Sequence, residues 1–258
     1  MNSSFILTFS DVISHSSKMK EIGIPCSSGF KNEDLMRMFS VLPIGTAELH
    51  NIRDILPSTF YNIPDSYVLI MRSTFKSFSD EIIKVFTSEE SNNIEGQITG
   101  VNWDRERFHN GRIVENKLNH KLLFNDMYDG YKSFPNIEEN IGTIYNSRRI
   151  ESIRQLHILL ESTMGSGLFI EGTSYYDINQ CYTPFGQEKK KKKIIGLCIG
   201  NSIPLCFKWF HNTQITSDIY KIILNHGDLF IMSEMAAGLN KESKTKLYIK
   251  HGFGENLN

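Results

Sequence analysis

The C-terminal part of the chain is a series of short β-rich runs separated by turn residues. From Gly167 onward the runs read GLFIEGTSYYDI, KIIGLCIG, IPLCFKWF, DIYKIIL, DLFIMSE and TKLYIKHG. Short strands at such regular spacing are typical of a β-sandwich or a jelly roll. Strands and helices do not alternate here, which argues against a Rossmann or TIM-barrel arrangement. We therefore predict a mainly β fold.

Helical and extended patterns flank this region. Ser66–Arg72 is a β-rich run and predicts a strand, whereas Ser79–Phe86 predicts a short helix with Ser79 as its N-cap. Ser147–Met164 is the clearest helix, because apolar residues recur there at helical spacing and Gly165 ends the pattern. The expected fold class is thus mainly β (α+β), with helices flanking the sheets.

The first 60 residues are rich in serine and show little periodicity. We interpret residues 1–60 as a loosely structured N-terminal extension. The total length of 258 residues fits one large domain or two small ones, and a single all-β domain could fill most of it.

Charge limits the partners of the chain. With 28 Lys and Arg against 29 Asp and Glu, the net charge of −1 excludes a globally basic nucleic-acid binder but leaves room for a local basic face. The lysine run 189–193 could contact phosphates. We favour a solvated hairpin or strand edge, which would deter edge-to-edge pairing.

Cysteine usage and the N-terminal sequence bear on location. The four cysteines form no Cys-x-x-Cys motif, which argues against a structural zinc site, and they are too sparse for a secreted disulfide scaffold. The N-terminal segment has no signal-peptide pattern, and the apolar runs are too short to span a bilayer. We expect an intracellular protein, in the cytoplasm or nucleus, without a membrane partner.

A mononuclear iron site requires two imidazoles and one carboxylate on one face. The only literal His-x-Asp is His226-Gly227-Asp228, and His251 follows too closely to return beside it. We interpret the first motif as a turn. His251 ends a strand and is either structural or a ligand. Its upstream partner should then lie at 185–190, where Glu188 offers a carboxylate but no imidazole occurs.

Several segments together resemble one enzyme family. They are SYVLIMR, WDRERFHNGRIVENKLNHKLLFND, EGTSYYDINQCYTPFGQEKKKKKIIGLCIGNSIPLCFKWF, LNHGDLFIMSEMAAG and KLYIKHGFG. In this order and spacing, over residues 65–254, they resemble AlkB-like 2-oxoglutarate- and Fe(II)-dependent dioxygenases of a subgroup from large DNA viruses and microbial eukaryotes. The resemblance implies a double-stranded β-helix (jelly roll) within a domain of residues 61–258, with its strands mainly at 167–254.

The resemblance also implies a metal site, with departures. The family's carboxylate ligand falls on Glu188 and its distal histidine on His251, but its first histidine falls on Gly186, which has no side chain. The arginine that holds 2-oxoglutarate should follow the distal histidine, and no arginine follows Arg154. Lys250 or another lysine is the candidate substitute, although an ammonium cannot form the bidentate fork of a guanidinium.

Further family positions concern the substrate and the framework. Tyr175, Tyr176 and Asp177 are candidate substrate-binding residues, although tyrosines in alternating strands are equally typical of a core and Asp177 could cap a turn. Trp103 and Asp104 match a Trp-Asp pair that we interpret as structural. In the segment that ends KLLFND, Asn119 stands where the family has an arginine, and Lys121 stands where it has an asparagine.

Three hypotheses follow from these matches. The first is an active dioxygenase that uses Fe(II) and 2-oxoglutarate to hydroxylate or demethylate an N-methyl group on nucleic acid or another substrate. It requires a replacement imidazole, from His109, His120 or His211. The second is an inactive jelly-roll scaffold that binds a nucleic acid or a protein. The third is a decayed copy of the enzyme. All three share one fold.

Overall fold

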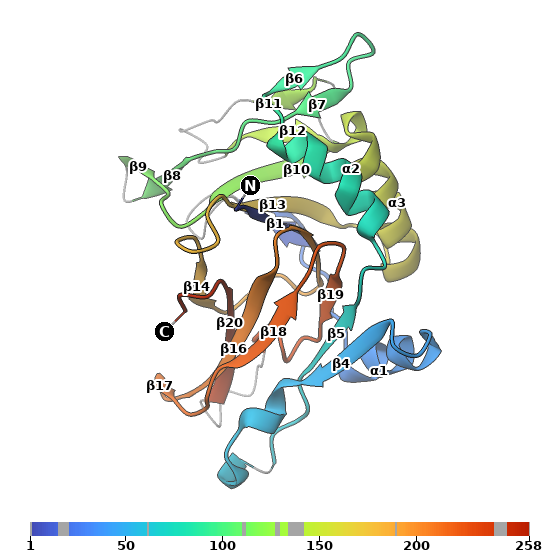
Figure 1. The fold of residues 1–258 in the computed structure, drawn as a ribbon. Helices are drawn as coiled ribbons and strands as arrows, with labels where there is room; N and C mark the ends of the chain where they lie inside the picture. Colours follow the sequence, from blue (N-terminus) through green and yellow to red (C-terminus); the bar gives the residue numbers. More distant parts are fainter. Residues whose placement is uncertain are drawn as a thin grey trace.

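The structure is a computed structural model that describes residues 2–14, 21–60, 62–109, 112–126, 130–133, 142–188, 190–239 and 247–257, the side chains of 107–109 excepted. Two curved β-sheets face each other, and two helices cover the outer face of the larger one (Figure 1). The predicted class, mainly β with a jelly-roll-like arrangement and flanking helices, is confirmed.

The major sheet has nine strands in the order β11-β12-β10-β13-β1-β15-β19-β5-β4. All neighbours pair antiparallel except β10 and β12, which are parallel. In this order, the strands are Lys132–Ser133, Ile144–Asn146, His120–Asn125, Phe169–Tyr175, Ser4–Ser10, Ile194–Gly200, Leu229–Met232, Tyr67–Met71 and Ala47–Asn51.

The minor sheet has the order β14-β20-β16-β17, and β18 pairs with β16 beside β17. Its strands are Thr183–Gly186 (β14), Leu247–Phe253 (β20), Ile203–His211 (β16), Gln214–Ile215 (β17) and Tyr220–Leu224 (β18). Three short hairpins lie outside the two sheets: β2–β3 (Val12–Ile13 and Ile22–Gly23), β6–β7 (Ser91–Asn92 and Ile98–Gly100) and β8–β9 (Glu106–His109 and Arg112–Glu115).

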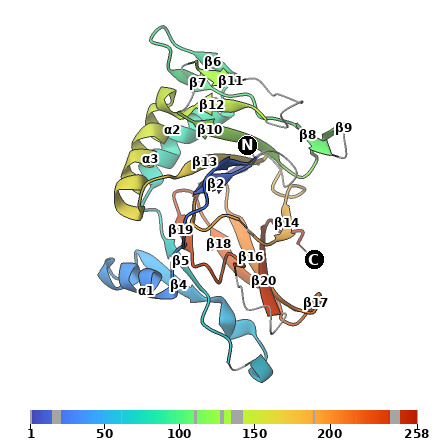
Figure 2. The same cartoon turned by 180° about the vertical axis from the view of Figure 1, so that it is seen from behind.

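Helices α2 (Lys76–Thr87) and α3 (Glu151–Met164) lie side by side against the major sheet, and α1 (Asn32–Val41) lies near β4 and β5 (Figures 1 and 2). The helix predicted at Ser147–Met164 is present as α3, preceded by a 3-10 turn at Ser147–Arg149. Further 3-10 turns are Ile52–Ile55 and Ser58–Phe60. None of the helices described is long and apolar enough to cross a membrane.

The predicted cap of α2 is wrong. The helix starts three residues before Ser79, with Phe75 in the N-cap position, and Ser79 is buried inside its first turns. Packing of the apolar ring of Phe75 into the core accounts for the earlier start, because tertiary burial outweighs the small gain from a polar cap.

Strand β1 divides two hydrophobic cores. Phe5, Leu7 and Phe9 pack under α2 and α3, whereas Ile6 points into the core between the two sheets. This alternation is the period-2 pattern of a strand that is buried on both faces. The interpretation of residues 1–60 as a loosely structured extension is therefore wrong, because Ser4–Ser10 is a central strand that pairs with both β13 and β15.

The place of β1 follows the symmetry of the jelly roll. Consecutive strands β13, β14, β15 and β16 alternate between the sheets, and β20 lies between β14 and β16 in the minor sheet. The matching slot of the major sheet, between β13 and β15, is filled by β1. The first strand of the chain thus completes the roll that the C-terminal strands begin, and residues 61–258 alone would lack it.

Candidate functional site

A polar cavity of about 110 Å³ lies between the two sheets. Strands β1, β10 and β13 form one wall, and β14, β20 and the segment after β14 form the opposite wall. Its ionisable lining residues are Lys121, Glu171, Tyr175, Glu188, Lys191 and His251. A cavity of this chemistry inside an apolar core is the candidate site of the molecule.

The cavity brings together the positions implied by the family resemblance. Gly186 on β14 is the Cα partner of His251 on β20, so a side chain at position 186 would share the face of the imidazole. Glu188 lies two residues further on and is fixed by a hydrogen bond from its backbone N–H to the carbonyl of Ala237. All three positions line the same cavity.

His251 is buried and incompletely bonded. Its side chain is 8% exposed, and Nδ1 has no hydrogen-bond partner within the described part of the chain. Burial, with a contribution from the ammonium of Lys191, lowers the pKa of His251 even though the nearby Glu188 carboxylate acts in the opposite direction. The imidazole is consequently neutral at physiological pH and offers an unused nitrogen to the cavity.

An ion network centred on the buried Glu171 occupies the cavity wall beside His251. Glu171 on β13 accepts a short hydrogen bond from Lys121 on β10 and pairs with Lys191 Nζ at 3.2 Å. Lys191 Nζ also lies 3.7 Å from Glu188 Oε1. The Lys191 ammonium therefore lies between the two carboxylates of the cavity.

Electrostatics keep this network ionised. Burial opposes the charged form of Glu171, but Lys121 and Lys191 outweigh burial and lower the pKa of Glu171 to about 2. Burial likewise opposes the charge of Lys191, but Glu171 and Glu188 outweigh it and raise the pKa of Lys191 above its usual value. Lys191 is a permanent cation in this site.

The donor set does not fit a mononuclear iron centre. Position 186 supplies no donor, and over the described ranges no group of three His, Cys, Asp or Glu side chains is arranged to hold a metal. His120 stacks on Tyr176 and His211 lies against Phe60, so neither lines the cavity. The third alternative imidazole, His109, belongs to a side chain outside the described set.

The basic residue expected for 2-oxoglutarate lies elsewhere. Lys250 points to the opposite face of β20 from His251, and its Nζ lies 4.4 Å from the ring centre of Phe210. The expectation that Lys250 lines the site is therefore wrong, because side chains alternate along a strand. The family resemblance places the arginine after the distal histidine. The position between β13 and β15, on the opposite wall of the cavity, is occupied by β1, which contributes Ile6 and Thr8 to the cavity and no arginine.

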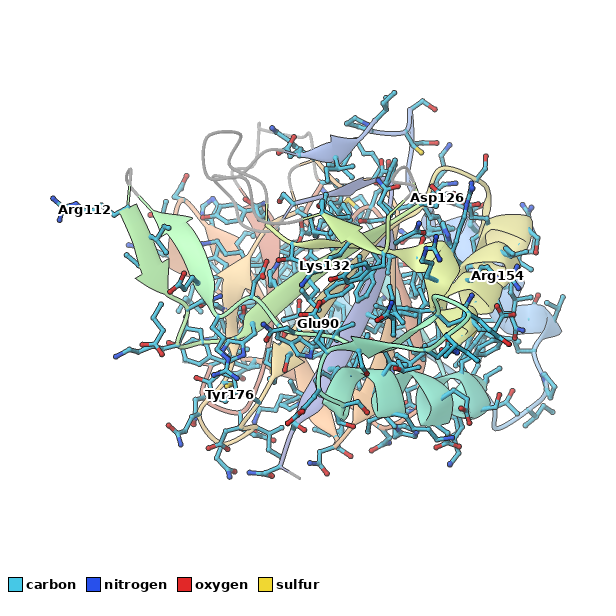
Figure 3. All side chains as sticks on the ribbon, turned by 90° about the horizontal axis from the view of Figure 1, so that it is seen from above. Glu90, Arg112, Asp126, Lys132, Arg154 and Tyr176 are labelled. Carbon is cyan, nitrogen blue, oxygen red and sulfur yellow. The ribbon has the colours of Figure 1, made fainter. Side chains whose placement is uncertain are left out.

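The three candidate substrate residues separate in the structure. Tyr175 lines the cavity, and its hydroxyl lies 2.7 Å from Thr183 Oγ1. Tyr176 is 43% exposed on the flank of the molecule (Figure 3). Asp177 caps the following turn by accepting hydrogen bonds from Asn179 N–H and the Gln180 side chain. Of the three, only Tyr175 can contact a molecule in the cavity.

The ion network does not follow from the sequence pattern. The lysine run predicts a solvated hairpin or strand edge, but it leads into the central strand β15, and the N–H groups of Lys192 and Lys193 donate to buried Asp11. Lys189 lies outside the described residues. Glu171 was detectable, because strand alternation places it on the same face as Tyr175.

Two structural interpretations are confirmed. His226-Gly227-Asp228 is a turn, and Asp228 is fully buried there and paired with Arg72 at 2.6 Å. Trp103 packs against the rings of Phe5 and Phe86. Its neighbour Asp104 accepts hydrogen bonds from the backbone and hydroxyl of one threonine, Thr143.

Comparison with known proteins shows similarity to a viral protein. No family model matches the chain. The chain is 27% identical over 256 residues to "Uncharacterized protein R156" of Acanthamoeba polyphaga mimivirus. The match covers 96% of this chain and 94% of the viral protein, so it includes most of residues 1–60 together with the β-sheet region.

Proposed function

We propose that this protein is an AlkB-like jelly roll that works without iron, as a binding scaffold. The sequence resemblance supports the AlkB-like part of this proposal, and the contents of the cavity support a site that works without iron. The observation that carries the proposal is the Lys191 ammonium between Glu171 and Glu188, in a site where Gly186 replaces a ligand.

The lysine replaces the charge that a metal ion would supply. The carboxylate of Glu171 is buried and requires a nearby cation, and Lys191, which also lies near the partly exposed carboxylate of Glu188, meets that requirement permanently. Single charges about 4 Å apart interact by roughly 4 kcal/mol at an effective dielectric constant of 20, and a divalent ion doubles this value. Repulsion from Lys191 would therefore oppose a metal held by Glu188 and His251 alone.

The active dioxygenase remains the second candidate. Its support is the shared cavity of Glu188 and His251 and the unpartnered Nδ1 of the imidazole. In that reading the substrate is an N-methyl group on nucleic acid or another molecule, with Fe(II) and 2-oxoglutarate as cofactors. We also propose an intracellular location, because the four cysteines are free thiols, as is usual in reducing compartments.

Metal titration separates the two candidates. Mn(II), an oxygen-stable substitute for Fe(II), is titrated by calorimetry with and without 2-oxoglutarate into the wild-type chain, Gly186→His, Gly186→His/Lys191→Met and Gly186→Ala. A Cβ at position 186 meets one atom within 4 Å, a backbone oxygen 3.8 Å away, so the backbone leaves room for a side chain to begin there. We expect no binding by wild type or Gly186→Ala, weak binding by Gly186→His, and at least tenfold tighter binding by the double variant.

Two results would overturn the scaffold proposal. Tight, 2-oxoglutarate-dependent binding of Mn(II) by the wild-type chain would restore the dioxygenase. Equal affinity of Gly186→His and the double variant would show that Lys191 does not oppose the metal. Thermal unfolding of each variant verifies that the protein remains folded.

A further inference from the structure

The ionisable groups that line the polar cavity between the sheets sum to zero net charge. Two lysines and two glutamates supply the charges: Lys121, Lys191, Glu171 and Glu188. His251 and Tyr175 are neutral, because burial lowers the pKa of the imidazole and raises that of the phenol. Burying a further net charge inside a protein is costly, so this cavity favours a molecule without net charge.

Part of the hydrogen-bonding capacity of the cavity is unused. Nδ1 of the buried His251 has no hydrogen-bond partner in the parts of the chain that the structure describes. Lys191 Nζ donates to Glu171, but it lies 3.7 Å from Glu188 Oε1, which is too far for a hydrogen bond. Buried polar atoms are hydrogen-bonded as a rule. The unpartnered imidazole beside this loose ion pair therefore points to a molecule that enters the cavity and bonds to both.

The cavity opens to solvent beside Gly186 and Glu188. Gly186 is exposed and has no side chain to cover the opening, and the Glu188 side chain is 34% exposed. Exposure then falls to 12% for the side chain of Lys191 and to 5% for that of Glu171. Glu188 therefore lies at the mouth of the cavity, with Lys191 behind it, and a molecule that enters meets the carboxylate and the ammonium together.

The volume of the cavity limits the size of that molecule. It is about 110 Å³, whereas a cavity of about 150 Å³ holds one benzene ring. By this comparison the cavity accommodates about five non-hydrogen atoms, and any further atoms would extend into the mouth. Glycine has this size, as has the part that all α-amino acids share.

We propose that the cavity binds a small α-amino acid, such as glycine or alanine, as its zwitterion. The carboxylate of the ligand accepts a hydrogen bond from Lys191, and its ammonium group donates to Glu188 and to the acceptor nitrogen of His251. The four charges then alternate in sign around a ring, so each one lies between two opposite charges. This inference rests on the proposed function, because it names the ligand class of a cavity that works without iron.

The test is a calorimetric titration of the full chain with glycine, in a buffer that contains EDTA so that no metal takes part. Methylamine and acetate are titrated alongside, because each carries one of the two charges of glycine. Concentrations reach about 10 mM, since so small a ligand binds with micromolar affinity at best. The variants are Glu188→Gln and Lys191→Met. Their matched controls are Glu21→Gln and Lys190→Met, because Glu21 and Lys190 form an exposed ion pair outside the cavity.

We expect glycine to bind the wild-type chain and to bind each cavity variant at least tenfold more weakly, whereas the two controls stay within twofold of wild type. Methylamine and acetate should bind wild type at least tenfold more weakly than glycine, because each adds a net charge and leaves one partner unused. Glycine should also shift the NMR ring signals of His251 but not those of His120, which lies outside the cavity. Thermal unfolding verifies that each variant is folded, and Glu188→Gln, at the partly exposed mouth, keeps the size of the side chain.

Several results would contradict the amino-acid site while leaving the metal-free scaffold intact. One is the absence of glycine binding to folded wild type at the highest concentration, which would mean that water alone fills the cavity. Others are equal binding of acetate or methylamine and an unchanged affinity of folded Glu188→Gln. A different result would overturn both proposals: glycine that binds only when Mn(II) replaces EDTA would show that a metal holds it.

Discussion

Gly186 and His251 face each other across the β14–β20 pair, and the imidazole has no side chain opposite it. The space in front of His251 is bounded by Lys191 and Glu188 rather than by a second histidine. The chemistry of the cavity is therefore that of a neutral imidazole beside a permanent cation.

The protonation of His251 tests this arrangement. Burial and the Lys191 charge lower the pKa of the imidazole, so Lys191→Met should raise that pKa by removing a positive neighbour while burial persists. The measurement is an NMR pH titration of the ring carbons. Lys190→Gln is the matched control, because the Lys190 ammonium is exposed and paired with Glu21. An identical titration of His251 in wild type and Lys191→Met would contradict the assigned contact.

Glu171 should account for a large part of the decrease in the free energy of unfolding at acid pH. Its pKa falls from 4.5 to about 2 on folding, so its carboxylate stabilises the folded state above about pH 4.5 and loses that effect as the pH falls toward 2. Glu171→Gln should lower the free energy of unfolding by about 3 kcal/mol at pH 7. The difference from wild type should shrink between pH 4.5 and 2, as measured by urea unfolding at each pH.

A surface carboxylate provides the control for this prediction. Glu151 pairs with Arg154 in an exposed part of α3. Glu151→Gln should change the free energy of unfolding by less than about 1 kcal/mol at pH 7. Equal losses for the two variants would contradict the buried network.

The two ends of the described chain meet at one turn. Asn2 donates a side-chain hydrogen bond to Asp177, and Asn256 donates one to the carbonyl of Asn179. Joining the ends with a flexible linker of about eight residues, which reaches roughly 26 Å when extended, and opening the chain between Ile44 and Gly45 should preserve the fold. Ile44 is fully exposed, and such tips tolerate new termini.

In that permuted chain β1 follows β20 in sequence and should still pair with β13 and β15. We expect an unchanged circular dichroism spectrum and a melting temperature within several degrees of wild type. Opening the joined chain inside β15 between Gly196 and Leu197 is the control and should prevent folding, because β15 pairs with both β1 and β19. A misfolded first permutant beside a folded control would refute the assignment of β1 to the slot.

The sequence by itself determined the mainly β class, the helix that ends at Met164 and the turn at Gly227. These features follow from local periodicity, turn chemistry and motif spacing, which are written along the chain. The first strand was not predictable in the same way, since its burial on both faces removes the alternation of polarity that identifies a strand.

Tertiary structure alone decided the contents of the cavity. Lys191 belongs to a run of identical residues, and only the folded backbone directs it to Glu171 on β13 while Lys190 remains exposed. Lys250 lies opposite Lys208 only because of the β16–β20 register, which joins residues 42 positions apart. Charges act through space, so their partners depend on which strands become neighbours, and that choice is made by the cooperative burial of the whole sheet.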